Sequence, residues 1–385
     1  FRPEQMIWLG AGSALRANGT ALIDTRNAAG LRLGDVLGGG RVTVRAEQGS
    51  IVGATGASIS VDGARDLLDI GAGIPVRTSV ASAAGTIELT AAESLLYQGS
   101  LSGAAPAGSQ AAAGRLIVGL DPSNRGVLPL VGPDGIPRGP HRLLVQDFGG
   151  SLPGAGTAVD PLYASTGFVP LNALRAGGFS SLDLVVRSSA VNTNITTGAP
   201  VPDTPDSLPI IEFPEDLTLR MARSITLDAA ILRTASSQVS LAAPYVGIGY
   251  TDSRVKLDGA LPDKTGTSNP QPTSVPIRLS PTAGSGVLTV TADLAELIGE
   301  SVTQGFGDTA AGLDGVIIQS TGDVRLRGVR KFLEQEYAGL FRTAGNLRID
   351  AQRIYPSTLT SFAVEVEGAG GQLVLGGGGG SAAPL

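Results

Sequence analysis

Several carboxylates that could do chemistry lie in one proline-rich stretch of the sequence. Cleavage of a polysaccharide needs two carboxyl groups at a controlled separation, or carboxylates that hold Ca²⁺ beside a basic residue. Residues 200–216 read PVPDTPDSLPIIEFPED, and because proline cannot donate to a sheet, this stretch favours a loop exposed to solvent. We interpret its acidic residues as members of a solvated loop and keep a polysaccharide-cleaving site as the alternative: Asp203, Asp206, Glu212, Glu215 and Asp216.

Three further aspartates, Asp308, Asp314 and Asp323, recur at short spacings with glycines close by. The Ca²⁺-binding repeat of β-helical proteins has the pattern GGxGxDxUx, which this sequence lacks, so we predict that these aspartates form turns. Cysteine is absent as well, which excludes disulfides, thiolate metal sites and cysteine nucleophiles. The sequence therefore predicts no metal site and no cofactor.

A catalytic histidine would have to be His141, because the chain has no other. It follows Pro140 in a loop rich in proline and glycine, and we expect it to be exposed there. No phosphate-binding pattern GxxxxGK[ST] is present, no GxGxxG lies between a strand and a helix, and Lys264 is isolated. We therefore predict no catalytic residue and no enzymatic activity.

Aromatic side chains that could stack on a sugar are few and scattered. Trp8 is the sole tryptophan. Tyr245 follows Ala-Ala-Pro and Tyr355 precedes a proline, and we expect both to pack at corners of the fold. The sequence does not gather the tyrosines into one platform: Tyr97, Tyr163, Tyr245, Tyr250, Tyr337 and Tyr355.

The elements that position these residues repeat at a nearly constant spacing between Leu217 and Ile248. Alternating apolar pairs begin at Leu217, Ile225, Val239 and Val246, with steps of 22 and 21 residues between equivalent strands. Strands that recur with a period of 20 to 50 residues are typical of stacked coils. The sequence therefore predicts an all-β right-handed parallel β-helix with excursions of loops and short helices.

Similar strand pairs occur through most of the chain. We expect an irregular or helix-like start over 1–35, interrupted by a strand at 21–24. Further along we expect a strand at 143–145 and helices at 293–299 and 331–339. The rungs should number on the order of 11–14 and form a rod about 50–70 Å long. Spacings of 22 and 23 residues, from Val302 to Val324 and from Leu326 to Ile349, predict a return of the period. The expected organisation is coils over 1–120, coils with proline- and glycine-rich excursions over 121–216, coils with a loop at 258–276 over 217–375, and a flexible tail over 376–385.

Composition fits this interpretation. Hydrophobic residues make up 42% of the chain but aromatic ones only 4%, so the core must consist of Val, Ile, Leu and Ala. The 55 glycines suit the many tight turns of a coil. A net charge of -6 argues against nucleic acid as a partner, and no apolar run is long enough for a membrane span.

Three blocks of sequence, 19–63, 217–249 and 347–362, resemble the coil-and-turn blocks of filamentous-haemagglutinin-type exoproteins. Members of this family are very long, are secreted by the two-partner pathway of Gram-negative bacteria and act as adhesins or surface filaments. The resemblance implies an internal segment of such a protein, located outside the cell or at the bacterial surface. It carries over no functional residue, because the amino-terminal secretion motifs and an Arg-Gly-Asp triplet are missing.

The sequence therefore predicts a structural or adhesive segment, with a carbohydrate-active β-helix (a polysaccharide lyase or hydrolase) as the alternative. The resemblance implies an outer-membrane two-partner transporter as the secretion partner and a host or neighbouring cell surface as the target. Bare ends of a solenoid also favour end-to-end self-association. We expect contacts to concentrate on the excursions at 121–170, 200–216 and 258–276.

Overall fold

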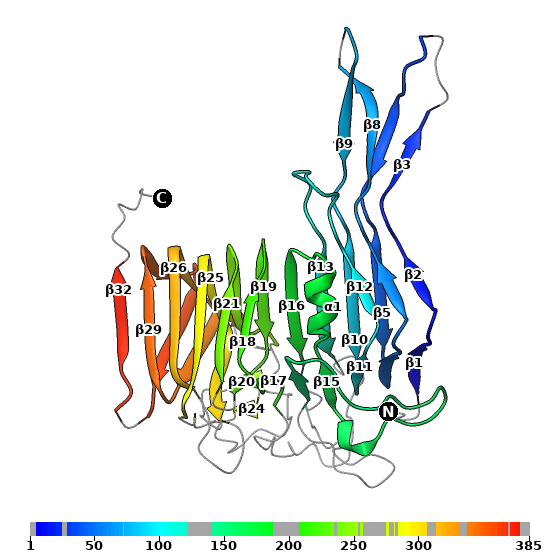
Figure 1. The fold of residues 1–385 in the computed structure, drawn as a ribbon. Helices are drawn as coiled ribbons and strands as arrows, with labels where there is room; N and C mark the ends of the chain where they lie inside the picture. Colours follow the sequence, from blue (N-terminus) through cyan, green and yellow to red (C-terminus); the bar gives the residue numbers. More distant parts are fainter. Residues whose placement is uncertain are drawn as a thin grey trace, which may run out of the picture.

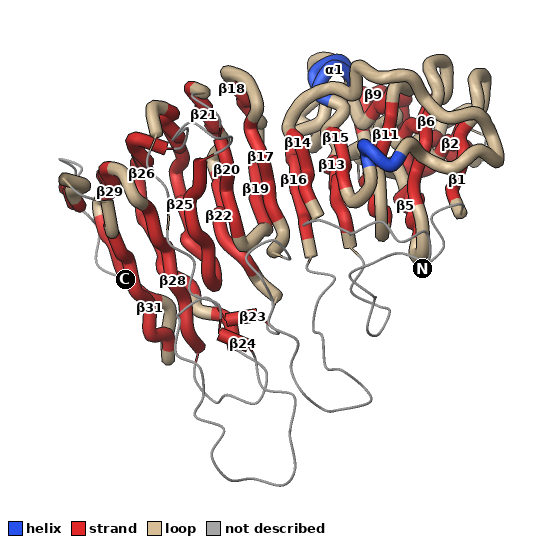
Figure 2. Tube along the Cα trace, turned by 90° about the horizontal axis from the view of Figure 1, so that it is seen from below, coloured by secondary structure: helices blue, strands red, loops and turns tan. Residues whose placement is uncertain are grey.

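Strands stacked in rungs make up nearly the whole fold, which is a parallel β-helix with one arm that stands out from its side (Figure 1). The view from below shows the rungs as one continuous row (Figure 2). A computed structural model describes residues 5–24, 29–71, 73–121, 141–187, 208–234, 237–252, 255–256, 275–276, 281, 284–305, 313–330, 337–368 and 370–377.

The strands of each rung lie on three faces, which we call face 1, face 2 and face 3. Face 1 is a parallel ladder of ten strands among the described residues. In stacking order it contains β1 (Met6–Leu9), β6 (Ser50–Gly53), β11 (Leu95–Tyr97), β15 (Thr166–Phe168), β14 (Arg142–Leu144), β17 (Ile210–Phe213), β20 (Ile231–Thr234), the end of β25 (Gly286–Gly305), β28 (Tyr337–Thr343) and β31 (Thr360–Val366). The short β27 (Val329–Arg330) pairs antiparallel with β28.

Face 2 is a second parallel ladder that runs beside the first. It contains β5 (Arg41–Ala46), β10 (Thr86–Ala91), β13 (Arg115–Leu120), β16 (Ser181–Val186), β19 (Ser224–Asp228), β22 (Tyr245–Tyr250), the middle of β25, the end of β26 (Leu313–Arg327) and β30 (Arg353–Pro356).

Face 3 changes along the rod. The first three rungs form it from β2 (Ala14–Arg16), β7 (Ser58–Ser60) and β12 (Ser100–Ser102), and helix α1 (Leu171–Ala176) lies next to β12. Later rungs form it from β18 (Leu217–Arg220), β21 (Gln238–Ala242), the starts of β25 and β26, β29 (Asn346–Ala351) and β32 (Leu373–Gly377). A parallel pair, β23 (Val255–Lys256) and β24 (Val275–Pro276), lies apart from the three faces.

The core consists of aliphatic columns that run through the rungs. Alternation turns every second side chain inward, and parallel register then stacks inward residues of neighbouring rungs on one another. The predicted 22- and 21-residue steps are register pairs, because Leu217 lies opposite Val239 and Ile225 opposite Val246. One column on face 2 contains Val44, Leu89, Val118, Leu184, Leu227, Ile248, Leu297 and Leu326.

The order of rungs is crossed at one point on face 1. β14 precedes β15 in the chain, yet β15 pairs with β11 and lies between β11 and β14. β14 then pairs with β17, so the strand predicted at 143–145 is confirmed within the predicted excursion. The segment that follows β14, which includes the 3-10 helix η1 (Pro161–Tyr163), forms an outer layer over face 1. There the ring of Phe148 lies 5.0 Å from the rings of Tyr163 and Phe168.

Two antiparallel hairpins form the arm. One is β3 (Thr20–Ile23) with β4 (Gly34–Leu37), and the other is β8 (Arg65–Ile70) with β9 (Val76–Ala81). They rise from face 3 of the first two rungs and stand well above the rod (Figure 1). The irregular or helix-like start predicted over 1–35 is therefore wrong for the described residues, because β1 and β2 lie there, whereas the strand predicted at 21–24 is confirmed as β3.

The helix predicted at 293–299 is also wrong, because these residues lie inside β25. Ala295 and Leu297 face the core while Glu296 faces outward, since strands β22 and β26 on either side impose a period of two on this segment. Gly299 has a φ of 56° at the corner between faces 2 and 1, where a β-carbon would lie 2.0 Å from the Tyr250 carbonyl oxygen. Of the helix predicted at 331–339, residues 337–339 belong to β28 and the others lie outside the described residues.

Two numerical expectations also differ from the structure. Val324 lies opposite Ala295 and Ile349 opposite Ile318, so the spacings from Val302 to Val324 and from Leu326 to Ile349 are not register pairs. The ten-strand ladder gives a rod of about 43 Å at a strand spacing of about 4.8 Å, shorter than expected. The arm and the outer layer account for the difference, because they use residues that were assigned to rungs. Residues 376–377 of the expected tail belong to β32, and 378–385 lie outside the described residues.

Candidate binding surfaces

The acidic residues of the proline-rich stretch do not form a paired-carboxylate site among the described residues. Glu212 is 1% exposed on β17, so the prediction of a solvated loop is wrong for it. Glu212 lies on a strand of face 1 whose neighbouring residues Ile211 and Phe213 face the core. Its own side chain points outward and is buried near Arg142 and Arg233. Glu215 and Asp216 are exposed, and an oxygen of Asp216 accepts a hydrogen bond from the Gln238 amide at 2.8 Å. Asp203 and Asp206 lie outside the described residues.

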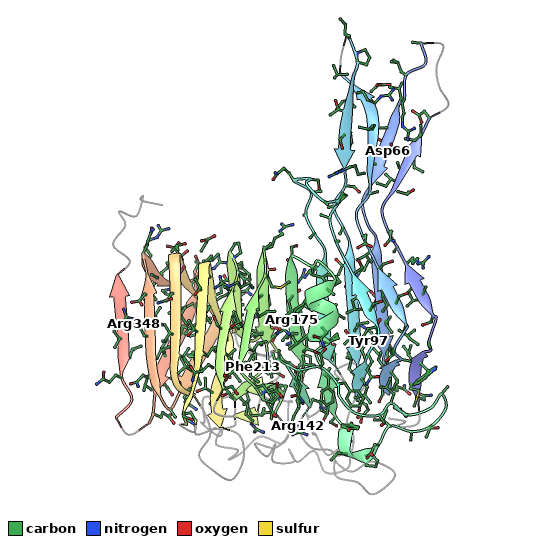
Figure 3. All side chains as sticks on the ribbon, viewed as in Figure 1. Asp66, Tyr97, Arg142, Arg175, Phe213 and Arg348 are labelled. Atoms are coloured by element: carbon green, nitrogen blue, oxygen red, sulfur yellow. The ribbon has the colours of Figure 1, made fainter. Side chains whose placement is uncertain are left out.

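Burial raises the pKa of the Glu212 carboxyl, and this effect outweighs the opposing charges of Arg142 and Arg233. Its Oε2 atom has no hydrogen-bond partner among the described residues. Arg233 lies opposite Glu212 in the ladder, and Arg142 lies at the lower edge of the rod in Figure 3. Among the described residues, the charged groups that act on this buried carboxyl are the two guanidinium groups of Arg142 and Arg233.

His141 is 2% exposed, so the expectation of an exposed loop histidine is wrong. Its Nε2 atom lies 3.0 Å from the Ala92 carbonyl oxygen. Because a carbonyl only accepts, Nε2 carries the proton and donates. The backbone carbonyl of His141 accepts from the Ile210 amide, which joins the residue to the rung of β17. The histidine therefore ties two rungs together and does not face solvent.

Asp323 does not form a turn as predicted, because it lies within β26. Its carboxylate accepts two hydrogen bonds from Arg353 at 2.8 Å and one from the Tyr355 hydroxyl at 3.2 Å. The guanidinium of Arg353 lowers the pKa of Asp323. Asp314 also lies in β26, and Asp308 lies outside the described residues. Tyr355 therefore contacts a neighbouring rung through the hydrogen bond of its hydroxyl group.

Ion pairs between neighbouring rungs follow the outward side of face 2. Each joins a nearly buried carboxylate to an arginine one rung away, so the charges of the carboxylates are engaged. Tyr245 extends this pattern because its hydroxyl donates to Glu296 at 2.6 Å. The pairs are Glu88 with Arg41 and Arg45, Asp183 with Arg115, Asp228 with Arg187, Glu296 with Arg325, and Asp323 with Arg353. Among the described residues no group of three or more His, Asp or Glu side chains is arranged to hold a metal.

The arm concentrates exposed apolar side chains. Ile74 is 90% exposed, Val76 62% and Leu22 55%, and Ile23, Leu37, Leu67 and Ile70 are exposed beside them. Asp69 joins the two hairpins: it accepts from the Arg32 backbone amide at 2.6 Å and from the Arg77 guanidinium. The sequence analysis missed this surface. The signal was the run Ile70-Gly-Ala-Gly-Ile-Pro-Val76, an uncharged turn between two alternating strands.

Residues that the structure describes line open clefts on the rod, of which two bear on function. One of about 550 Å³ runs along the beginnings of five face 2 strands at the base of the arm, and Arg115, Asp183, Arg223 and Tyr245 are among its lining residues. The other, of about 640 Å³, lies at the first rung and contains Trp8. The sequence identified Trp8 as the sole tryptophan but did not predict that it lines a cleft. Alternation with the inward Ile7 and Leu9 was the signal that it faces outward.

Comparison of the chain with protein-family models, with curated proteins and with solved structures found no match. The resemblance to filamentous-haemagglutinin-type exoproteins therefore remains a prediction. In the part of the chain that the structure describes, no helix is both long and apolar enough to cross a membrane.

Proposed function

We propose that this chain is a structural and adhesive segment of a bacterial filamentous exoprotein, without catalytic activity. In this role its rod is extended by further β-helical rungs and its arm makes contact with a cell surface. The observation that carries the proposal is that, in the part of the chain that the structure describes, core columns reach the first and the last rung and leave apolar side chains exposed there.

The last rung shows this most clearly. Leu373 and Leu375 on β32 lie opposite Leu347 and Ile349, which are 0% and 1% exposed, yet they are themselves 45% and 60% exposed. They occupy core positions that nothing covers among the described residues. A further rung with the same inward pattern would bury them, at about 25 cal/mol per Å² of apolar surface.

The first rung repeats the pattern on face 3. Leu15 is 36% exposed, whereas its column partners Ile59 and Leu101 are 1% and 3% exposed. Parallel edges with inward apolar residues at both ends fit a head-to-tail contact, which propagates into filaments because it does not close.

Sedimentation velocity and negative-stain microscopy over a range of concentrations test this assembly. We expect the chain to form longer rods as its concentration rises, and a Leu373→Asp, Leu375→Asp variant to remain single. Val374→Asp is the matched control, because Val374 is 43% exposed on the same strand but faces outward. Rods that never lengthen, or an equal effect of Val374→Asp, would contradict the proposal.

The adhesive part of the proposal is supported by the apolar arm. Contiguous exposed apolar surface is typical of interaction sites. Beads coated with the chain should adhere to cells less well when Ile74→Ser and Val76→Ser are combined. Leu359→Ser is the control, because Leu359 is 81% exposed on the rod. Equal adhesion of the arm variant and the original chain would remove the arm from the proposal.

Secretion through an outer-membrane two-partner transporter and a location at the bacterial surface complete the proposal. The family-like blocks and the absence of cysteine, which suits export of an unfolded chain, support it. Antibody labelling of intact cells tests it directly. Labelling should require the transporter, and labelling only after the cells are permeabilised would contradict it.

A further inference from the structure

The cleft at the first rung contains the sole tryptophan of the chain. It has a volume of about 640 Å³, and its lining includes Gln5 just before β1, Met6 and Trp8 on β1, Arg45 on β5, and Glu47 and Gln48 at the corner between β5 and β6. We propose that this cleft binds a neutral oligosaccharide, with one sugar ring stacked on the indole of Trp8.

Trp8 faces the cleft because of its place in the strand. Ile7 and Leu9 pack against the core, so Trp8 points to the outward side of face 1. Its register partner Val52 and the next residue in that column, Leu96, are both 0% exposed, since the outer layer covers the later rungs. At the first rung this outward column is partly open at Trp8, as it is again further along at Leu144 and Arg233. The column therefore ends in a half-exposed indole.

The indole also lies close to its own backbone. A β-carbon at Gly10 would lie 3.3 Å from the indole nitrogen, so the ring rests against the backbone just after its own strand. The indole N–H makes no hydrogen bond to the described residues, so it is able to donate to a ligand. A fixed apolar ring with a spare donor fits a sugar, which presents an apolar ring face and hydroxyl groups at its rim.

The polar residues of the cleft indicate a neutral ligand. Arg45 donates to Glu88 at 2.8 Å, and this bond raises the pKa of the guanidinium. Arg41 pairs with the same glutamate, so the two arginines are balanced by Glu88 and Glu47. A polyanion would find no net positive charge here. The amides of Gln5 and Gln48 each offer a donor and an acceptor, as hydroxyl groups require.

A sugar-binding cleft would deepen the proposed adhesive role, and its biological use rests on that role. The test of sugar binding does not depend on the assembly of rods. With one tryptophan in the chain, selectively excited tryptophan fluorescence reports on this cleft alone. The probes are cellohexaose, maltohexaose and chitohexaose, with trigalacturonate as the anionic comparison. At least one neutral probe should change the emission saturably and protect the indole from quenching by acrylamide.

Calorimetry then tests the residue. Trp8→Ala should weaken binding of that probe by about tenfold or more, and Trp8→Phe by less, because a phenyl ring keeps part of the stacking surface. Gln48→Ala is the second variant should Trp8→Ala fail to fold, and Tyr337→Ala on β28 is the control. No saturable response to any neutral probe, tighter binding of trigalacturonate, or unchanged binding by Trp8→Ala and Gln48→Ala would each overturn the inference. Assembly of longer rods would be unaffected by such a result, so the two proposals fail separately.

Discussion

The register of β18 and β21 can be tested by a disulfide between their outward residues. Thr218 lies opposite Ser240 in this parallel pair, and neighbouring strands are about 4.8 Å apart. That distance lies within the usual Cα separation of a disulfide, about 4.4–6.8 Å. Thr218→Cys with Ser240→Cys should therefore oxidise readily. The chain contains no other cysteine, so the product is unambiguous.

The size of the effect follows from the length of the closed loop. The two positions are 22 residues apart in sequence, and closing a loop of that length stabilises the folded state by about 3 kcal/mol in the chain-entropy view. The urea midpoint of the oxidised variant should rise accordingly and return to its original value after reduction. A non-reducing gel should show the shift in mobility that accompanies the cross-link.

The matched control moves one cysteine by two residues on the same face. Ala242 lies opposite Arg220, so its Cα is about 8 Å from that of Thr218, beyond the reach of a disulfide. Thr218→Cys with Ala242→Cys should remain reduced under the same conditions. Equal oxidation of both pairs, or oxidation of the control pair alone, would refute the 22-residue rung.

Two further outcomes follow from burial and charge. Leu184 is 0% exposed in the face 2 column, so Leu184→Ala should lower the free energy of unfolding by about 3 kcal/mol in urea titrations, whereas Ser79→Ala on the exposed arm should leave it nearly unchanged. A small effect at Leu184 would contradict the close packing of that column. The guanidinium of Arg77 lowers the pKa of Asp69 from 3.8 to about 2. Because the folded pKa is below the unfolded one, the bonds that the Asp69 carboxylate accepts from Arg32 and Arg77 should be complete above about pH 4 and lost as the pH falls through about 2. Carbon NMR of the Asp69 carboxyl should show this midpoint, and a midpoint near 3.8 would exclude the ion pair.

The sequence by itself determined the class of fold and much of its register. Apolar residues at every second position, with turns between them, allow each strand to bury one side only against the next rung. This is why the pairs Leu217 with Val239 and Ile225 with Val246 could be predicted from spacing alone. The lack of cysteine, the single histidine and the lack of a phosphate-binding motif likewise narrowed the kinds of chemistry that the sequence predicts.

Local sequence patterns did not predict the structure correctly where neighbouring strands impose the conformation. Asp293–Gly299 has the composition of a helix, but β22 and β26 hold it as a strand. Glu212 and His141 lie among prolines that indicate a loop, yet both are buried, because residues distant in sequence cover them. Burial depends on what packs against a residue, and a local stretch of sequence does not contain that information.

The surfaces proposed to function were decided by tertiary structure. The arm exists because two hairpins from successive rungs stack and share Asp69, and its apolar tip is exposed because nothing among the described residues packs on it. Trp8 becomes a candidate binding residue because it lines an open cleft with the corner between β5 and β6, a neighbourhood that the fold creates. The sequence specifies which side of a strand a residue occupies. Only the stacking of rungs decides whether that side is covered or open.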